Sequence, residues 1–207
     1  METLSALAGE TPGAFLLLAL ILIASLVGLF ASPTLIERCL FRPYWLVRNN
    51  EWPTLVTSAF VHADLAHLLF NAFTFWAFAF SLEASMGTPR FVALYAFGLF
   101  ASSLGTYYKH RHDPEYRTLG ASGAILAVLF AAIVYTPGSS IFILPIPVPI
   151  PAPLFALGYL SYTYYASRQA RGRVNHDAHL GGALAGIGFV MLTDWPAVER
   201  AWRFVGG

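Results

Sequence analysis

Six runs of mainly apolar residues divide the chain, and their lengths predict helices that cross a lipid bilayer. The first run, residues 13–32, contains no charged residue. The others lie at about 63–82, 91–108, 119–135, 153–166 and 178–192. A bilayer core of about 30 Å requires about 20 residues of helix. The fifth and sixth runs are short for this, yet the pattern as a whole predicts an all-α fold, a polytopic bundle of six transmembrane helices.

A proline-rich segment separates the fourth run from the fifth. Five prolines stand at every second position, namely Pro145, Pro147, Pro149, Pro151 and Pro153. Proline has no N–H and its ring clashes with the preceding helical turn, so this segment cannot be helix. We expect a stiff extended connector at a membrane surface. The chain has no internal repeat and no separate soluble segment, so we expect a single domain over residues 1–207.

The composition supports the membrane assignment. Hydrophobic residues make up 57% of the chain and charged residues only 11%, against about 25% charged in an ordinary soluble domain. This excludes a water-soluble enzyme and a disordered linker. With 12 Lys and Arg against 11 Asp and Glu, there is no basic face for a nucleic acid. The single cysteine, Cys39, cannot form an internal disulfide, and no metal-ligand spacing accompanies it. The lipid bilayer is the expected partner.

Polar residues within the apolar runs are candidates for function, because burying them in a membrane is costly. The second run carries His62, His67 and Asn71. His67 and Asn71 are four residues apart and therefore share one helix face. They could act in a functional site, or their hydrogen bonds could simply join two helices.

The fourth run opens with Gly120-Ala121-Ser122-Gly123. A cluster of small residues in a membrane helix often serves close packing. However, the start of a helix has unpaired backbone N–H groups that could stabilise an oxyanion formed after attack by Ser122. Glycines on either side would also leave room for the backbone of a substrate.

The sixth run opens with His176-Asp177-Ala178-His179, followed by Gly182 and Gly186. The G-x-x-x-G spacing lets this helix approach a neighbour very closely. Its expected neighbour is the fourth run, where Gly123 and Ala127 have the same spacing. Such packing would bring His179 to Ser122, and a histidine can take the proton from a serine hydroxyl.

Six spans place the starts of the second, fourth and sixth helices on the same side of the membrane. A nucleophile, a base and an amide donor would then meet on three helices. At this point the sequence resembles the rhomboid family of intramembrane serine proteases, in its bacterial six-span form, over about residues 50–192. The resemblance rests on the G-x-S-G at 120–123, the A-H-x-G-G at 178–182, the H-x-x-x-x-H-x-x-x-N at 62–71, the Leu82-Glu83 pair and the proline-rich segment before the fifth run.

The resemblance implies the role of each residue. Ser122 would be the nucleophile and His179 the general base and acid of a dyad. Asn71, His67 and the backbone around Ser122 and Gly123 would form the oxyanion site. His62, Gly120, Gly182 and Gly186 would support it. The substrates would be transmembrane proteins, and neither a metal nor an organic cofactor is implied.

Two features depart from the family pattern. An aromatic residue often follows the nucleophile by four positions and stacks on the histidine, but Leu126 stands there. The Trp-Arg pair common in the first external loop is absent, and the nearest match is Trp52-Pro53-Thr54. Asp177 lies two residues from His179, on nearly the opposite helix face, which favours a dyad over a triad.

Other functions are possible. A rhomboid-like pseudoenzyme that binds or escorts membrane proteins is the main alternative, although such relatives usually lack the serine or the histidine. A channel or transporter would be favoured by paired carboxylates or repeated halves, and a metalloprotease by H-E-x-x-H; the sequence has none of these. His110, His112 and His176 flank charged loops and are most simply interfacial.

The distribution of charge and the family resemblance give opposite orientations of the protein in the membrane. Nine of the 12 Lys and Arg residues fall on the Ser122 side and three, Arg90, Arg200 and Arg203, on the other. The positive-inside rule would then place Ser122 toward the cytoplasm. The resemblance implies the bacterial inner membrane with a site that opens to the periplasm, and we follow the resemblance.

Overall fold

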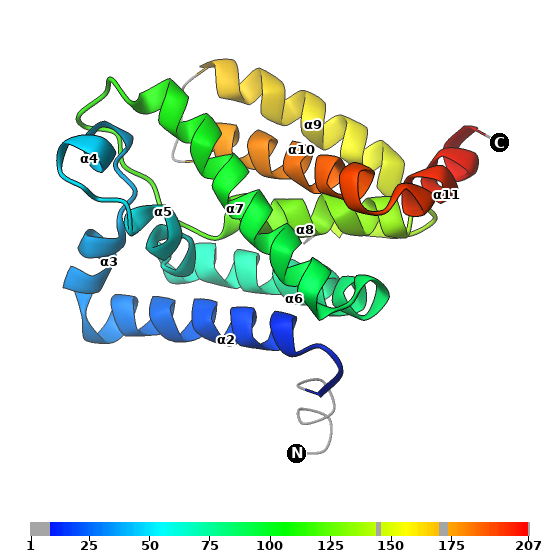
Figure 1. Ribbon diagram of the computed structural model, residues 1–207, viewed down its shortest axis with the longest axis horizontal. Coiled ribbons are helices and arrows are strands. Elements are labelled where there is room, and N and C mark those ends of the chain that lie inside the picture. Colours follow the sequence, from blue (N-terminus) through cyan, green and yellow to red (C-terminus); the bar gives the residue numbers. More distant parts are fainter. Residues whose placement is uncertain (1–8, 144–145, 170–173, 207) are drawn as a thin grey trace.

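The computed structural model describes residues 9–143, 146–169 and 174–206, and it is mostly helical (Figure 1). Its longer helices are α2 (Pro12–Leu26, continued by a π-helical turn, Val27–Ala31), α6 (Leu65–Met86), α7 (Thr88–His110), α8 (Ser122–Tyr135), α9 (Ala152–Gln169), α10 (His176–Thr193) and α11 (Trp195–Gly206). Shorter helices lie between α2 and α6: α3 (Pro33–Cys39), α4 (Pro43–Arg48), α5 (Thr54–Thr57) and a 3₁₀ turn, Ser58–Phe60. The sequence pattern predicted no secondary structure for this segment between the first two expected spans.

Most helices begin where the sequence supplies a start signal. Pro12, Pro33 and Pro43 each occupy the first turn of a helix, where the missing N–H is not needed. The side chain of Asp64 caps α6 by accepting a hydrogen bond from the His67 N–H. Gly87, with a φ of 81°, makes the sharp turn between α6 and α7, a conformation that favours glycine.

Helix α8 is the centre of the molecule. In Figure 1 the helices α2, α6, α8, α10 and α9 follow one another across the view, and α7 crosses in front of the middle three. Contacts agree with this order, because α8 packs against α6, α7 and α10, while α2 packs against α6, and α9 against α10. Nearly every side chain of α8 after Ser122 is buried.

Glycines bring α8 and α10 into backbone contact. A Cβ added at Gly182 would overlap the Gly123 carbonyl, and one added at Gly186 would overlap the carbonyl of Ala127. The predicted approach of the G-x-x-x-G face to the fourth run is therefore confirmed. Helix α7 joins the same contact, because a Cβ at Gly123 would collide with the side chain of Ser102.

A buried carboxylate joins three helices at the end of the bundle away from Ser122. Glu83, 1% exposed, accepts hydrogen bonds from the backbone N–H groups of Gly13 (2.9 Å) and Ala14 (2.6 Å) and from the Thr88 hydroxyl (2.6 Å). A negative charge at the start of a helix is favourable, because unpaired N–H groups gather there. Glu83 thus fixes the start of α2 against α6 and α7.

Three helices of the described chain are long and apolar enough to cross a membrane: 12–31, α6 and α7. The bent pair α10 and α11, which turns through 113°, would make a fourth. Their outer faces carry exposed apolar side chains such as Leu16, Phe70 and Phe100, as expected for contact with lipid. Helix length and hydropathy therefore establish three or four spans and not the six expected. Helix α8 has only 14 residues, and α9 is not among the helices that are long and apolar enough to cross.

The proline-rich segment is extended, but it is not an isolated connector. Strands β1 (Ser140–Ile143) and β2 (Ile146–Pro151) form a two-stranded antiparallel sheet that pairs Ile141 with Ile150. The all-α prediction is wrong in this detail. The N–H of Ala152 bonds to the Ser139 carbonyl at 3.0 Å, and in the same register Ile150 directs its N–H toward β1, before the register shifts between Phe142 and Ile143. Pro149 and Pro151 take the alternate positions, where no N–H is required; Pro145 lies outside the described residues.

The close packing of α8 and α10 leads to a first prediction. Gly186→Ala should lower the free energy of unfolding in detergent by about 1–3 kcal/mol, because the added methyl overlaps the Ala127 backbone. Gly188→Ala is the matched control, since that position has open space around it and alanine favours helix. Equal stability of the two variants would contradict the packing described here.

Candidate active site

The structure brings Ser122 and His179 together. Ser122 is the first residue of α8, and His179 lies in the first turn of α10. The Ser122 Oγ and the His179 Nε2 are 2.9 Å apart, within hydrogen-bonding distance. This contact follows from the backbone approach of α8 to α10, because Gly182 lies less than one turn beyond His179. A hydroxyl and an imidazole so arranged can exchange a proton.

The loop before Ser122 is held by backbone hydrogen bonds and by one glycine. Thr118 forms an isolated β-bridge with Phe41, and the Gly120 N–H bonds to the Ser58 carbonyl at 2.8 Å. Gly120 has a φ of 115°, which other residues adopt only with strain. A Cβ at this position would also come within 3.0 Å of the His67 ring. Gly120 therefore lets the chain turn into α8 directly beside His67.

His62 connects this loop to α2. It is fully buried, and its Nδ1 lies 2.8 Å from the Ser25 Oγ, which donates to the Phe60 carbonyl. Its Nε2 accepts a hydrogen bond from the Ala121 N–H at 3.5 Å. The family resemblance implied a supporting role for His62, and these contacts join it to the backbone of the residue before Ser122. Ser25, its partner from the first apolar run, was not foreseen.

His67 and Asn71 lie on the face of α6 that meets the loop. The His67 ring packs against Gly120, where an added Cβ would come within 3.0 Å of it. It also packs edge-on against His62, with ring centroids 4.7 Å apart. The Asn71 side chain is buried, and its Nδ2 donates to the His67 carbonyl of its own helix at 3.0 Å. Asn71 thus has no hydrogen bond to Ser122 in this arrangement.

The start of α8 differs from the starts of α6 and α10. Asp64 caps α6, and Asn175 caps α10 by accepting from the Ala178 N–H at 3.0 Å. No side chain caps α8. The first N–H groups of a helix lack partners within it, so those around Ser122 and Gly123 are suited to bind a negatively charged oxygen.

Asp177 is engaged away from His179. Its carboxylate lies 2.9 Å from the Lys109 Nζ and 3.4 Å from the His110 Nε2, both at the end of α7. The described residues show no hydrogen bond between Asp177 and His179. The other ring nitrogen of His179, Nδ1, lies instead 3.1 Å from the Tyr159 Oη of α9. Tyr159 was not predicted from the sequence. An aromatic residue in the fifth run was an available signal, because Leu126 stands at the position where an aromatic residue usually stacks on the histidine.

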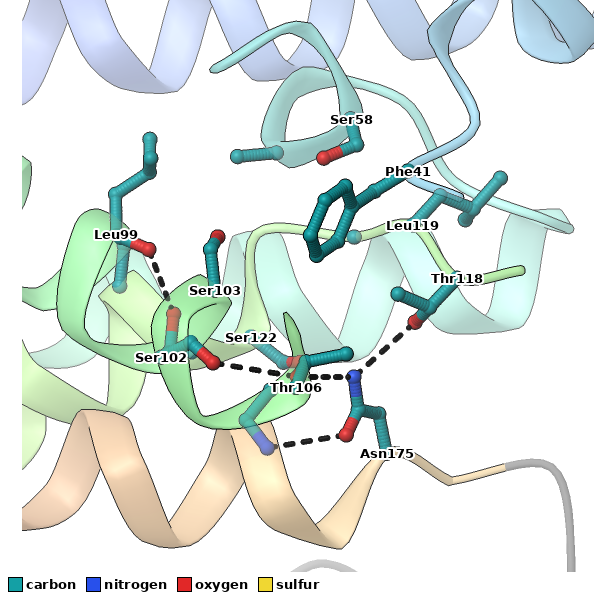
Figure 2. A pocket seen from close by; sticks show the side chains of 15 residues that line it. Phe41, Ser58, Leu99, Ser102, Ser103, Thr106, Thr118, Leu119, Ser122 and Asn175 are labelled. Carbon is teal, nitrogen blue, oxygen red and sulfur yellow. Dashed lines mark hydrogen bonds between the residues drawn. The ribbon is translucent and has the colours of Figure 1, made fainter. Parts of the chain in front are cut away.

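A small polar cavity of about 40 Å³ lies beside Ser122, between α7, α8 and the loops (Figure 2). The Asn175 side chain lines it and donates to the hydroxyls of Thr106 (3.0 Å) and Thr118 (3.4 Å). Its polar lining comes from Ser58, Ser102, Ser103, Thr106, Thr118, Ser122 and Asn175. A water molecule needs at least about 10–15 Å³ and two to four polar partners, so this cavity is large and polar enough to hold one.

No group of three His, Cys, Asp or Glu side chains in the described part of the chain is arranged to hold a metal ion. His110 stacks on Tyr116 with ring centroids 3.5 Å apart. His176 lies edge-on to Tyr162 and is 6.1 Å from His179 between ring centroids. Arg171 and Arg173, two of the nine cations counted on the Ser122 side, lie outside the described residues.

Comparison with known protein families identifies the chain. Residues 49–194, more than two thirds of its length, match the Rhomboid domain. The chain belongs to the rhomboid family. The matched region contains α6 to α10 and therefore Ser122, His179, His67 and Asn71, whereas α2 and its Ser25 lie outside it.

Individual relatives support the same assignment. The rhomboid chain is 40% identical over 82 residues, 40% of each protein, to the Bacillus subtilis protein named "Putative rhomboid protease YdcA". It is 33% identical over 138 residues to presenilin-associated rhomboid-like protein A, mitochondrial, of Danio rerio. It is 29% identical over 152 residues to RHOMBOID-like protein 12, mitochondrial, of Arabidopsis thaliana. The last two matches cover 66% of this chain but only 36% and 45% of those proteins.

Proposed function

We propose that this protein is an intramembrane serine endopeptidase that hydrolyses peptide bonds in or near the transmembrane segments of other membrane proteins. The observation that carries the proposal is the 2.9 Å contact between the Ser122 Oγ and the His179 Nε2. Membership of the rhomboid family and the relative named as a rhomboid protease support it. The whole relatives are longer than the matched region, so their activity enters here only as support.

The geometry supports a two-step hydrolysis. His179 would take the Ser122 proton as Oγ attacks the carbonyl carbon of the scissile bond, and would then return that proton to the leaving amine. This releases one product and leaves an acyl group on Oγ. A water, activated by His179, would attack the acyl carbon, release the acid and restore the serine. The polar cavity beside Ser122 could supply this water.

The uncapped start of α8 would stabilise the tetrahedral intermediates. Their negatively charged oxygen would face the backbone N–H groups of Ser122 and Gly123. We assign His67 and Asn71 to the same oxyanion site. The Asn71 amide has two N–H donors; one is bonded to the His67 carbonyl at 3.0 Å, and the other would donate to the substrate oxygen.

The dimensions of α8 support a site below the membrane surface in a six-span bundle. Fourteen residues extend for about 21 Å, whereas a bilayer core is about 30 Å thick. Because α8 is enclosed by α6, α7 and α10, it does not need to reach both surfaces. If it ends near one of them, its start at Ser122 lies roughly 9 Å below the other. Counting α8, α9 and α10 with the three long helices gives the six spans.

Removing either member of the dyad should abolish proteolysis. We expect Ser122→Ala and His179→Ala to show no cleavage of a model transmembrane substrate in liposomes, and Ser122→Ala to show no labelling by a fluorophosphonate. Ser85→Ala, at an exposed serine near the end of α6, is the control and should remain active. Cleavage by both dyad variants would refute the proposal. A wild-type protein that neither cleaves nor labels would favour the pseudoenzyme alternative.

Asn71→Ala should impair catalysis without abolishing it. Loss of one oxyanion donor typically lowers kcat by about 10²–10³, while the backbone donors at the start of α8 remain. The variant should retain fluorophosphonate labelling of Ser122 at a reduced rate. Asn49→Ala, at an exposed position directly after α4, serves as the control. Wild-type kcat in Asn71→Ala would remove Asn71 from the oxyanion site.

We further propose the inner membrane of a bacterium as the location, with Ser122 toward the periplasm and both termini in the cytoplasm. This follows the family resemblance against the excess of Lys and Arg on the Ser122 side. Fusion of reporters to the carboxyl terminus should give activity with a cytoplasm-requiring reporter. Activity with only a periplasm-requiring reporter would reverse the orientation.

A further inference from the structure

Tyr159 is distinguished from the other tyrosines of α9 by its surroundings. Tyr162, Tyr164 and Tyr165 are more than half exposed, whereas the Tyr159 ring turns inward. It packs on Phe130 of α8, with ring centroids 5.7 Å apart, and stacks on Phe155 at 5.6 Å. These contacts fix the ring and aim its hydroxyl at the start of α10.

That hydroxyl meets the ring nitrogen of His179 that Ser122 does not use. Tyr159 Oη lies 3.1 Å from Nδ1, and Ser122 Oγ lies 2.9 Å from Nε2. A neutral imidazole carries one proton, on either Nδ1 or Nε2. It can accept the serine proton through Nε2 only when its own proton is on Nδ1. An acceptor placed at Nδ1 therefore selects the tautomer that can act as a base.

In many serine hydrolases a carboxylate accepts the Nδ1 proton of the catalytic histidine. The neighbouring carboxylate here, that of Asp177, forms no hydrogen bond with His179 among the residues that the structure describes. Asp177 is bound by Lys109 and His110. The other charged or titratable groups near His179 in the described chain are His176 and His67, and neither has a hydrogen bond to it. If Tyr159 accepts from Nδ1, its own proton needs another acceptor. Thr163, one turn further along α9, has a buried hydroxyl with no hydrogen-bond partner in the described chain.

We propose that Tyr159 is a positioning residue for the dyad: its hydroxyl accepts the Nδ1 proton of His179 and thereby keeps Nε2 free to take the proton of Ser122. This inference rests on the proposed protease function and adds a third residue to it. Tyr159 does not touch the reacting atoms. Its effect on the rate passes through the proton position and the ring orientation of His179.

Tyr159→Phe tests the proposal, because it removes the hydroxyl and keeps the ring that packs on Phe130 and Phe155. A buried hydrogen bond between neutral groups is worth about a factor of ten in an equilibrium or a rate. We expect kcat for a model transmembrane substrate, and the rate at which a fluorophosphonate labels Ser122, each to fall about tenfold. KM should not change. Tyr165→Phe, a Tyr-to-Phe change at an exposed position of the same helix, should match the wild type in all three.

Each other result has a definite meaning. Unchanged kcat and labelling in Tyr159→Phe, in a wild-type background that is active, would overturn the proposal. A higher KM with unchanged kcat would also overturn it, because Tyr159 would then act on the substrate. An inactive wild type would instead reject the protease function itself. Comparing thermal unfolding of the two Phe variants separates a folding defect from a kinetic one.

Spectroscopy gives a readout that a purely structural role would not alter. The ¹⁵N chemical shifts of a histidine distinguish a protonated ring nitrogen from an unprotonated one. In protein labelled with ¹⁵N-histidine, the resonances lost in His179→Ala identify this ring. We expect the wild type to be protonated at Nδ1 and Tyr159→Phe to lose that preference. A wild-type ring protonated at Nε2, at a pH where the imidazole is neutral, would contradict the proposal.

Discussion

The contact between the backbones of α8 and α10 is the constraint on which the rest of the site depends. Gly182 and Gly186 allow the two helices to approach until side chains larger than hydrogen no longer fit. Hydrophobic burial does not drive helices together within a lipid bilayer, where tails are as apolar as leucine, so close packing takes over that part. The distance between the Ser122 hydroxyl and the His179 ring is therefore set by two positions that carry no reactive group.

Around this contact, three buried or half-buried polar side chains bond to other helices or to the loops. Glu83 binds the start of α2, and His62 joins Ser25 to Ala121. Asn175 caps α10 and reaches the threonines of α7 and the loop. An unpaired polar group costs several kcal/mol in hydrocarbon, so each pairing fixes where a helix begins relative to its neighbours. The loop before Ser122 is thus held by hydrogen bonds to Ser58, His62 and Asn175.

Much of this arrangement could be predicted from the sequence. Apolar runs located α2, α6, α7, α8, α9 and α10 to within a few residues, whereas α11 was not predicted. The spacing of Gly182 and Gly186 identified the helix against which α10 packs. The expected packing of the G-x-x-x-G face against the fourth run indicated that Ser122 and His179 should meet, as they do in the structure. These features are readable because periodicity and small-residue spacing are local properties of the chain.

The features that were missed depend on pairings between distant segments. Nothing local to Tyr159 distinguishes it from the three other tyrosines of α9, because its contact with His179 depends on how α9 is rotated against α10. The partner of Glu83 is the backbone of α2, which leaves no trace in residue identity. The short helices between α2 and α6 and the β-hairpin have too few residues for a period to be recognised.

The hairpin itself has a consequence for the behaviour of the protein outside the bilayer. On the edge of β2 that faces away from β1, Pro149 and Pro151 occupy the positions where N–H groups would otherwise point outward. At these two positions a second strand would find carbonyls but no donors, so it could not form a regular ladder there. In detergent or during insertion, when apolar segments of neighbouring molecules come together, this stretch of the edge resists growth into an intermolecular sheet.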